Sequence, residues 1–223
     1  MSSPKVKLKK LMRSFWLQSI FSFSLLCYAS SDPGQNGRSL KLDRHDLTVL
    51  GVTLGSSTLA QVESKLGKAM LFKIGRKEEA DKAVCYRSVS NEDDTILVFY
   101  FGALGGWTDV TQISVSKSRA LPWSTARCVS NSSVSRNLEV LRKLKLGSLT
   151  ADVVRVLGSP SRTAKNGLSY YFSHHCESEM LQGSKEGETP SRDSQCEVVD
   201  SVEAKFTAED GLIYLSFYHF VDR

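Results

Sequence analysis

The sequence predicts an α+β fold of two tandem repeats, each with short helices packed on one face of an antiparallel β-meander. Residues 54–69 (LGSSTLAQVESKLGKA) and 146–160 (LGSLTADVVRVLGSP) both run from one Leu-Gly pair, through a Ser/Thr helix-start signal, to a second Leu-Gly pair. Strand-like runs rich in β-branched and aromatic residues follow each copy. The offset of about ninety residues leaves room for one small structural unit per copy.

These observations divide the chain into five parts. We expect a signal peptide over residues 1–29, a flexible lead-in over 30–46, a first repeat over 47–120, a serine-rich linker over 121–137 and a second repeat over 138–223.

Each repeat is expected to begin with a capped helix. In the first copy Thr58 and Gln61 have the spacing of a capping box, and Gly67 is expected to end the helix. In the second copy Thr150 is the predicted N-cap and Gly158 the predicted end.

A high content of β-branched and aromatic residues predicts the strands, and alternation along the last two predicts their faces. On the last strand Ile213, Leu215 and Phe217 are expected to face the core. In the preceding strand, Asp200 occupies a position where the alternation calls for an apolar residue. This indicates a β-bulge nearby. A tight turn is predicted at residues 208–211, and the predicted strands are 83–89, 95–101, 110–116, 168–174, 197–207 and 212–221.

The N-terminus has the order of a secretory signal. Five Lys or Arg residues within residues 1–13 precede an apolar run over residues 14–26, and small residues follow. A retained membrane anchor is the alternative, although the run is shorter than the roughly 20 residues that cross a bilayer. Lipidation at Cys27 is a further alternative, but Leu26 stands where lipoprotein signals have a small residue.

Charge argues against nucleic acid and anionic lipid as partners. Removing the five basic residues of the signal from the 29 in the chain leaves 24, which equals the 24 acidic residues. A neutral protein has no electrostatic means of holding a phosphate backbone.

The cysteines other than Cys27 suggest disulfide bonds in an oxidising compartment: Cys85, Cys128, Cys176 and Cys196. Three pairings are possible, and one pair per repeat favours Cys85–Cys128 with Cys176–Cys196. No two of them have the Cys-x-x-Cys spacing of a metal site.

The pattern in the second copy resembles a known family. It is similar to the repeat of the BamE (SmpA/OmlA) outer-membrane assembly lipoproteins, which in tandem forms the secreted β-lactamase inhibitor proteins. The resemblance implies a non-enzymatic binding protein of the cell envelope or exterior. The residues that carry it are Leu146, Gly147, Thr150, Val153, Leu157, Gly158 and Pro160.

No catalytic, metal or cofactor site is predicted. His174 and His175 are neighbours on a predicted strand and would point to opposite faces, which disfavours a shared metal and a metal-dependent hydrolase. His219 is expected to be a satisfied histidine of the core or its rim. The chain contains no nucleophile elbow, zinc-protease helix or phosphate-binding loop.

Aromatic residues are the candidate partner-binding residues. Tyr100, Tyr171, Tyr214 and Tyr218 are expected on the sheet face away from the core, where they would serve as interface anchors or as ordinary cross-strand packing. Trp107, at the end of a Gly-rich loop, is predicted to contact the partner, with a lid over the sheet as the alternative.

The predicted function is that of an exported, non-enzymatic module, periplasmic or extracellular, that binds another protein as an inhibitor or an assembly factor. The alternative is a structural assembly protein of the outer membrane, anchored by a lipid on Cys27. Trp123, in the linker, is either a second anchor or a lid over the sheet.

Overall fold

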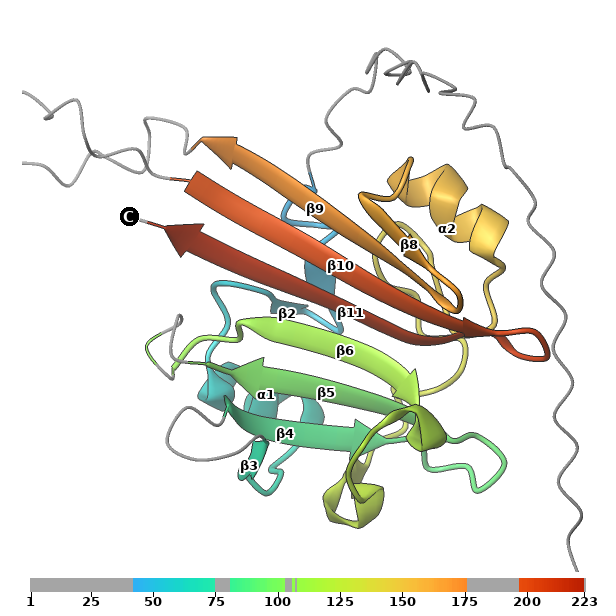
Figure 1. Ribbon diagram of the computed structural model, residues 1–223. Helices are drawn as coiled ribbons and strands as arrows, with labels where there is room; N and C mark the ends of the chain where they lie inside the picture. The colour runs from blue at the N-terminus through green and yellow to red at the C-terminus, as the bar shows by residue number, and fades with distance from the viewer. Residues whose placement is uncertain (1–41, 75–80, 103–105, 107, 176–196, 223) are drawn as a thin grey trace, which may run out of the picture. The chain divides into compact units, whose positions relative to one another are not determined.

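A single nine-stranded sheet dominates the fold (Figure 1). All its pairings are antiparallel except one, in which β7 (Val129–Ser130) runs parallel to β4. The order of the others across the sheet is β3 (Phe72–Ile74), β4 (Asp81–Arg87), β5 (Thr95–Phe101), β6 (Gln112–Lys117), β11 (Gly211–Asp222), β10 (Glu197–Thr207), β9 (Gly167–His175) and β8 (Arg162–Ala164).

The computed structural model describes residues 42–74, 81–102, 106, 108–175 and 197–222. All of these belong to one unit, Gly37–Arg223. Besides the sheet they form two α-helices, two 3-10 turns and a small hairpin. None of the helices in the described ranges is long and apolar enough to span a bilayer. The elements are α1 (Leu59–Leu66), α2 (Thr150–Leu157), η2 (Ser118–Ala120), η3 (Thr125–Arg127), β1 (Thr48–Val49) and β2 (Val52–Thr53).

The capping residues set the helix ends. At α1 the capping box of Thr58 and Gln61 is confirmed, and Gly67 ends the helix with φ 90°. The N-cap predicted for α2 is wrong by one residue, because Leu149 occupies that position. The Asp152 carboxylate accepts a hydrogen bond from the Leu149 N–H at 3.1 Å and so satisfies one of the free amides there.

The two matching sequence segments are held in the same way. The Gly55 N–H donates to the Val110 carbonyl at 2.8 Å, and the Val110 N–H donates to the Ser57 carbonyl at 2.8 Å. In the second copy the Gly147 N–H donates to the Leu212 carbonyl, and the Leu212 N–H donates to the Ser148 carbonyl. The resemblance between the segments is therefore a resemblance of local structure.

The predicted fold class is wrong. The chain does not form two α+β repeats with helices on separate meanders, because β6 pairs with β11 through five residue pairs, Gln112–Tyr218 to Ser116–Tyr214, and the sheet continues without a break. The described helices are only eight residues long. The fold is mostly β, with one large antiparallel sheet.

One face of this sheet carries the main core. The buried residues of both helices pack into a single cluster with the sheet residues of that face. The cluster crosses the β6–β11 junction and removes any boundary between the two halves of the sheet. Its largest fully buried members include Tyr86, Phe99, Phe101, Tyr170, Leu212 and Phe217.

The strand predictions are accurate, but the bulge was misplaced. The structure confirms β5 and β10 with the predicted bounds. Asp200 stays in regular register opposite His219, and the irregularity falls between Lys205 and Phe206, which pair with Tyr214 and Leu212. Ile213 has no partner in β10, and Leu212 is buried in the core position that was expected for Ile213.

Candidate functional site

The candidate site is the sheet face opposite the main core. Directly opposed residues of an antiparallel pair share a face, and the register aligns Tyr100, Gln112, Tyr218, Ser201 and Tyr171 in one row across five strands. Tyr214 lies on the same face, four residues before Tyr218. The structure thus brings the four predicted tyrosines onto one side of the sheet.

We call this surface the Tyr/Ser face. Nine of the twelve residues that define it are tyrosine or serine, and Val199 and Phe220 flank them on the same side of the sheet. Tyrosine and serine dominate antibody paratopes, because tyrosine offers contact area at low entropy cost and serine adaptable hydrogen bonds. The residues are Tyr100, Gln112, Ser114, Ser116, Ser169, Tyr171, Ser201, Glu203, Lys205, Tyr214, Ser216 and Tyr218.

Hydrogen bonds hold the middle of the Tyr/Ser face in place. The Gln112 amide donates to the Ser216 hydroxyl at 2.7 Å, and the Ser114 hydroxyl donates to the Tyr100 hydroxyl at 3.4 Å. The Lys205 ammonium lies 4.6 Å from the centre of the Tyr214 ring, within reach of a cation–π contact. These side chains are positioned before any partner arrives.

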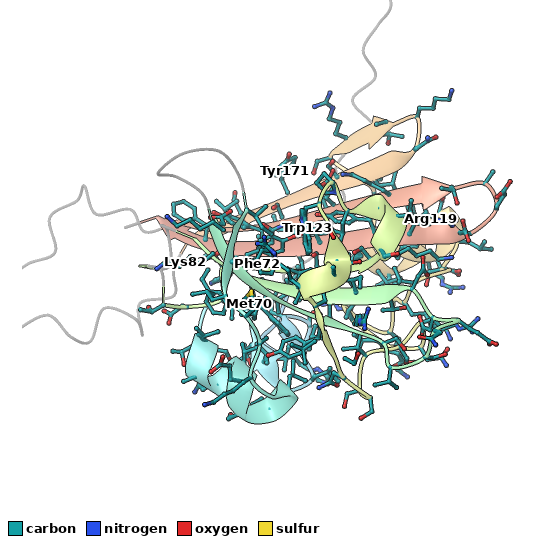
Figure 2. The ribbon with its side chains drawn as sticks, turned by 90° about the horizontal axis from the view of Figure 1, so that it is seen from below. Met70, Phe72, Lys82, Arg119, Trp123 and Tyr171 are labelled. Carbon is teal, nitrogen blue, oxygen red and sulfur yellow. A yellow bond between two sulfur atoms is a disulfide. The ribbon has the colours of Figure 1, made fainter. Side chains whose placement is uncertain are left out.

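Burial divides the four tyrosines into two roles. Tyr171 is 64 % exposed and Tyr218 is half-buried, so both can touch a partner (Figure 2). Tyr100 and Tyr214 are only 8 % and 9 % exposed and act as supports. Burial raises the pKa of Tyr100 to about 12 and also raises the pKa values of Tyr214 and Tyr218, which keeps these hydroxyls neutral.

A second buried cluster covers the other end of this side of the sheet, over β4 and β5. The Trp123 ring packs edge-on against Phe72, with ring centroids 5.2 Å apart (Figure 2). Trp123 is therefore a lid, one of its two predicted roles. Trp107 lies outside the described residues.

A disulfide ties this lid to the sheet. The sulfurs of Cys85 and Cys128 are 2.17 Å apart, which confirms the first of the two predicted pairs. Cys176 and Cys196 fall outside the described residues. Among the residues that are described, no three potential metal ligands gather. His174 and His175 end β9.

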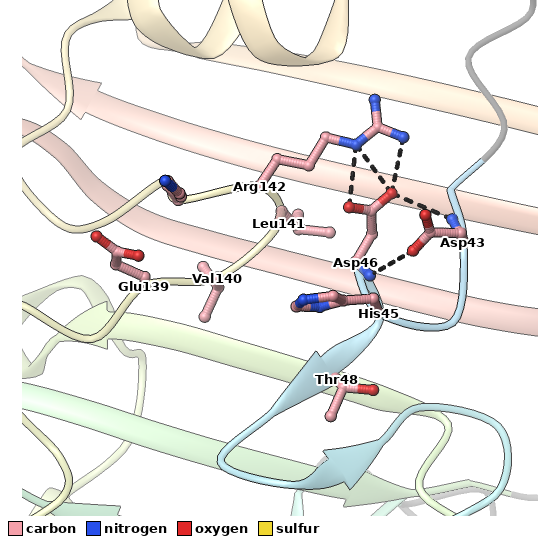
Figure 3. A pocket seen from close by; sticks show the side chains of 9 residues that line it. Asp43, His45, Asp46, Thr48, Glu139, Val140, Leu141 and Arg142 are labelled. Atoms are coloured by element: carbon pink, nitrogen blue, oxygen red, sulfur yellow. Dashed lines mark hydrogen bonds and ion pairs between the residues drawn. The ribbon is translucent and has the colours of Figure 1, made fainter.

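The sequence analysis missed a pocket of about 480 Å³ beside the turn that follows Val140 (Figure 3). Leu141, Arg142 and Lys143 all have positive φ, between 42° and 74°. The Arg142 guanidinium grips the Asp46 carboxylate there. Because that carboxylate is occupied, the pocket is a structural junction.

The serines of the Tyr/Ser face were also missed, although the sequence carried a signal. Ser114 and Ser116 alternate with the core residues Ile113 and Val115, and Ser216 lies between Leu215 and Phe217. An alternation of core residues with serine marks a strand face that avoids bulk and charge.

No family model, curated protein or solved structure matches the chain.

Proposed function

We propose that this chain is an exported, non-enzymatic protein that binds a partner protein through the Tyr/Ser face. The observation that carries the proposal is the alignment of Tyr171 and Tyr218, with their supports Tyr100 and Tyr214, on one side of a continuous sheet. Tyrosine side chains lose little conformational entropy on binding, because they have only two rotatable angles.

The polar residues among the tyrosines favour a protein partner. Glu203 and Lys205 supply both signs of charge. Gln112 and Ser201, which are partly exposed, supply neutral donors and acceptors. A central aromatic contact with a polar surround is the usual anatomy of a protein interface. The resemblance of residues 146–160 to BamE and to the β-lactamase inhibitors favours the same role, as an assembly factor or an inhibitor.

Export is supported by two features. The Cys85–Cys128 disulfide is compatible with an oxidising compartment, where such bonds persist. The basic, apolar and small-residue order of residues 1–29 is that of a secretory signal. A periplasmic or extracellular location follows from the proposal.

Site-specific photocrosslinking tests the surface. A photoreactive amino acid placed at Tyr171 should form an adduct with one protein of the native envelope or medium. The same probe at Leu149 is the matched control, because Leu149 is 63 % exposed but precedes α2, outside the Tyr/Ser face. Equal adducts at both positions, or none at Tyr171, would contradict the proposal.

Alanine substitution adds a quantitative measure. Tyr171→Ala with Tyr218→Ala should weaken capture of the crosslinked partner by at least about tenfold. Thermal stability should change little because neither side chain is part of a buried cluster. Unchanged capture would show that the partner binds elsewhere.

The second candidate is a structural outer-membrane protein anchored by a lipid on Cys27. The observation in its favour is a cysteine directly after the apolar run. Mass spectrometry of the mature N-terminus separates the two: a diacylglyceryl group on Cys27 supports the anchor, and a free Ser30 or Asp32 rejects it.

A further inference from the structure

A buried carboxylate and a half-buried imidazole form a pair on the core side of the sheet, away from the Tyr/Ser face. Asp200 of β10 is 1 % exposed and lies opposite His219 of β11. The His219 Nδ1 is 2.7 Å from the Asp200 Oδ1. A carboxylate this buried fixes the ring orientation, because it accepts a hydrogen bond from Nδ1–H and leaves Nε2 for other contacts.

Gly55 leaves space for the free edge of the ring. It has φ +75°, and a Cβ added there would lie 2.3 Å from the His219 Cδ2 and 3.0 Å from Nε2. The backbone beside Leu54 and Ser56 therefore approaches the ring more closely than any other residue type would allow. The Nε2 edge faces this segment.

A cavity of about 300 Å³ lies at this edge. Asp200 and His219 line it with the apolar side chains Leu42, Leu47 and Leu54 and the polar residues Arg44, Thr53 and Ser56. Arg44 is exposed and has no ion-pair partner among the residues that the structure describes. An apolar wall with a few convergent polar groups is the usual composition of a small-molecule site.

We propose that this cavity binds the carboxylate of a small ligand with a short apolar tail. The ligand carboxylate lies between the Arg44 guanidinium and the His219 Nε2–H, and the Ser56 hydroxyl donates from the rim. The tail packs on Leu42, Leu47 and Leu54. A free short-chain acid and the C-terminal residue of a peptide share this chemistry.

Charge balance links this binding to a proton. Nδ1 already donates to Asp200, so Nε2 can donate to the ligand only when the ring is protonated. The charged groups that line the cavity are Arg44, from the segment before β1, and Asp200, from β10; its other lining residues besides His219 carry no charge. Binding of the anion is therefore coupled to the uptake of a proton.

Calorimetric titration of the purified protein with hexanoate, acetate and hexanol tests the carboxylate and the tail separately. Hexanoate should bind more tightly than acetate, by about fourfold per added CH₂ until the tail fills the cavity. Hexanol should bind at least about tenfold more weakly than hexanoate. A peptide ending in leucine, compared with its C-terminal amide, tests the other source of the carboxylate.

Arg44→Gln should weaken hexanoate binding at least about tenfold, whereas Arg162→Gln, at an exposed arginine of β8, should not. Asp200→Asn with His219→Gln keeps an amide pair in place of the ion pair and should abolish the proton uptake. If that variant does not fold, NMR of the wild-type imidazoles replaces it: hexanoate should shift the His219 nitrogens and leave those of the exposed His45 unchanged. Equal binding of hexanol, unaltered binding by Arg44→Gln, a silent His219, or no binding of any carboxylate overturns the proposal.

Discussion

The guanidinium of Arg142 grips the carboxylate of Asp46, which lies 96 residues earlier in the chain. The Arg142 Nε is 3.0 and 2.9 Å from the two Asp46 oxygens, and Nη2 is 2.8 Å from Oδ2 (Figure 3). The contact joins the segment before β1 to the turn that follows Val140. The contact also holds Arg142 in place, although its φ of 62° is unfavourable for any residue with a Cβ.

Arg142→Gln should lower the free energy of unfolding by about 1–3 kcal/mol, because it leaves the nearly buried Asp46 carboxylate without its charged partner. Urea denaturation measures the change. Asp46→Asn combined with Arg142→Gln should cost less than the sum of the single substitutions. Strict additivity would show that the two side chains do not stabilise each other. The control is Lys143→Gln in the same turn.

Gly55→Ala should destabilise the protein by at least about 2 kcal/mol, since it combines a positive φ with a clash against His219. Gly158→Ala provides the comparison. Its φ of +79° is nearly the same and its ψ is −160°, but an added Cβ there would meet nothing within 4 Å, so only the backbone strain of about 1–3 kcal/mol is expected, without the cost of a clash. Equal losses in denaturant unfolding would show that the His219 ring does not constrain this position.

Replacing both Cys85 and Cys128 by alanine should lower stability by about 4 kcal/mol, from the entropy of a loop that spans 43 residues. Hydrogen exchange should speed up mainly over residues 118–128, because the bond anchors the end of the lid that carries Trp123. If the variant exchanges no faster over these residues than over the sheet, packing of Trp123 against Phe72 is sufficient to hold the lid without the disulfide.

Acid should weaken the contact between the β10–β11 turn and the end of β6. The Lys117 ammonium, with help from Thr207 and Arg119, holds the pKa of Asp210 below its ordinary value of 3.8. A carboxyl with a lowered pKa stabilises the fold above the unfolded value, and this contribution is lost as the pH falls through the folded pKa. The stability difference between wild type and Asp210→Asn should therefore shrink below about pH 4. A constant difference in acid titrations would contradict the role of these cations.

Local patterns were sufficient to predict most strands but not the way they assemble. The β-branched and aromatic residues of 95–101 and 197–207 are visible in a short window, so β5 and β10 were found with their bounds. The pairing of β6 with β11 joins residues about a hundred positions apart, and no local signal specifies it. A duplicated helix signal then suggested separate modules.

The candidate site was predictable in part for the same reason. Strand phase correctly placed the four tyrosines on one face, because alternation is local. Their unequal exposure was not predictable, since it depends on neighbours from other strands and on a lid whose Trp123 packs against Phe72. The Ile213 bulge likewise depends on how β10 and β11 meet, and neither strand shows it alone.

The strand that occupies the middle of the sheet follows every other described strand along the chain. Until β11 emerges from the ribosome, β6 and β10 each lack a neighbour and the main cluster lacks Leu212, Leu215 and Phe217. A nascent polypeptide of this kind stays loose through nearly all of its synthesis. Assembly of the described sheet therefore ends with a single late insertion at its centre.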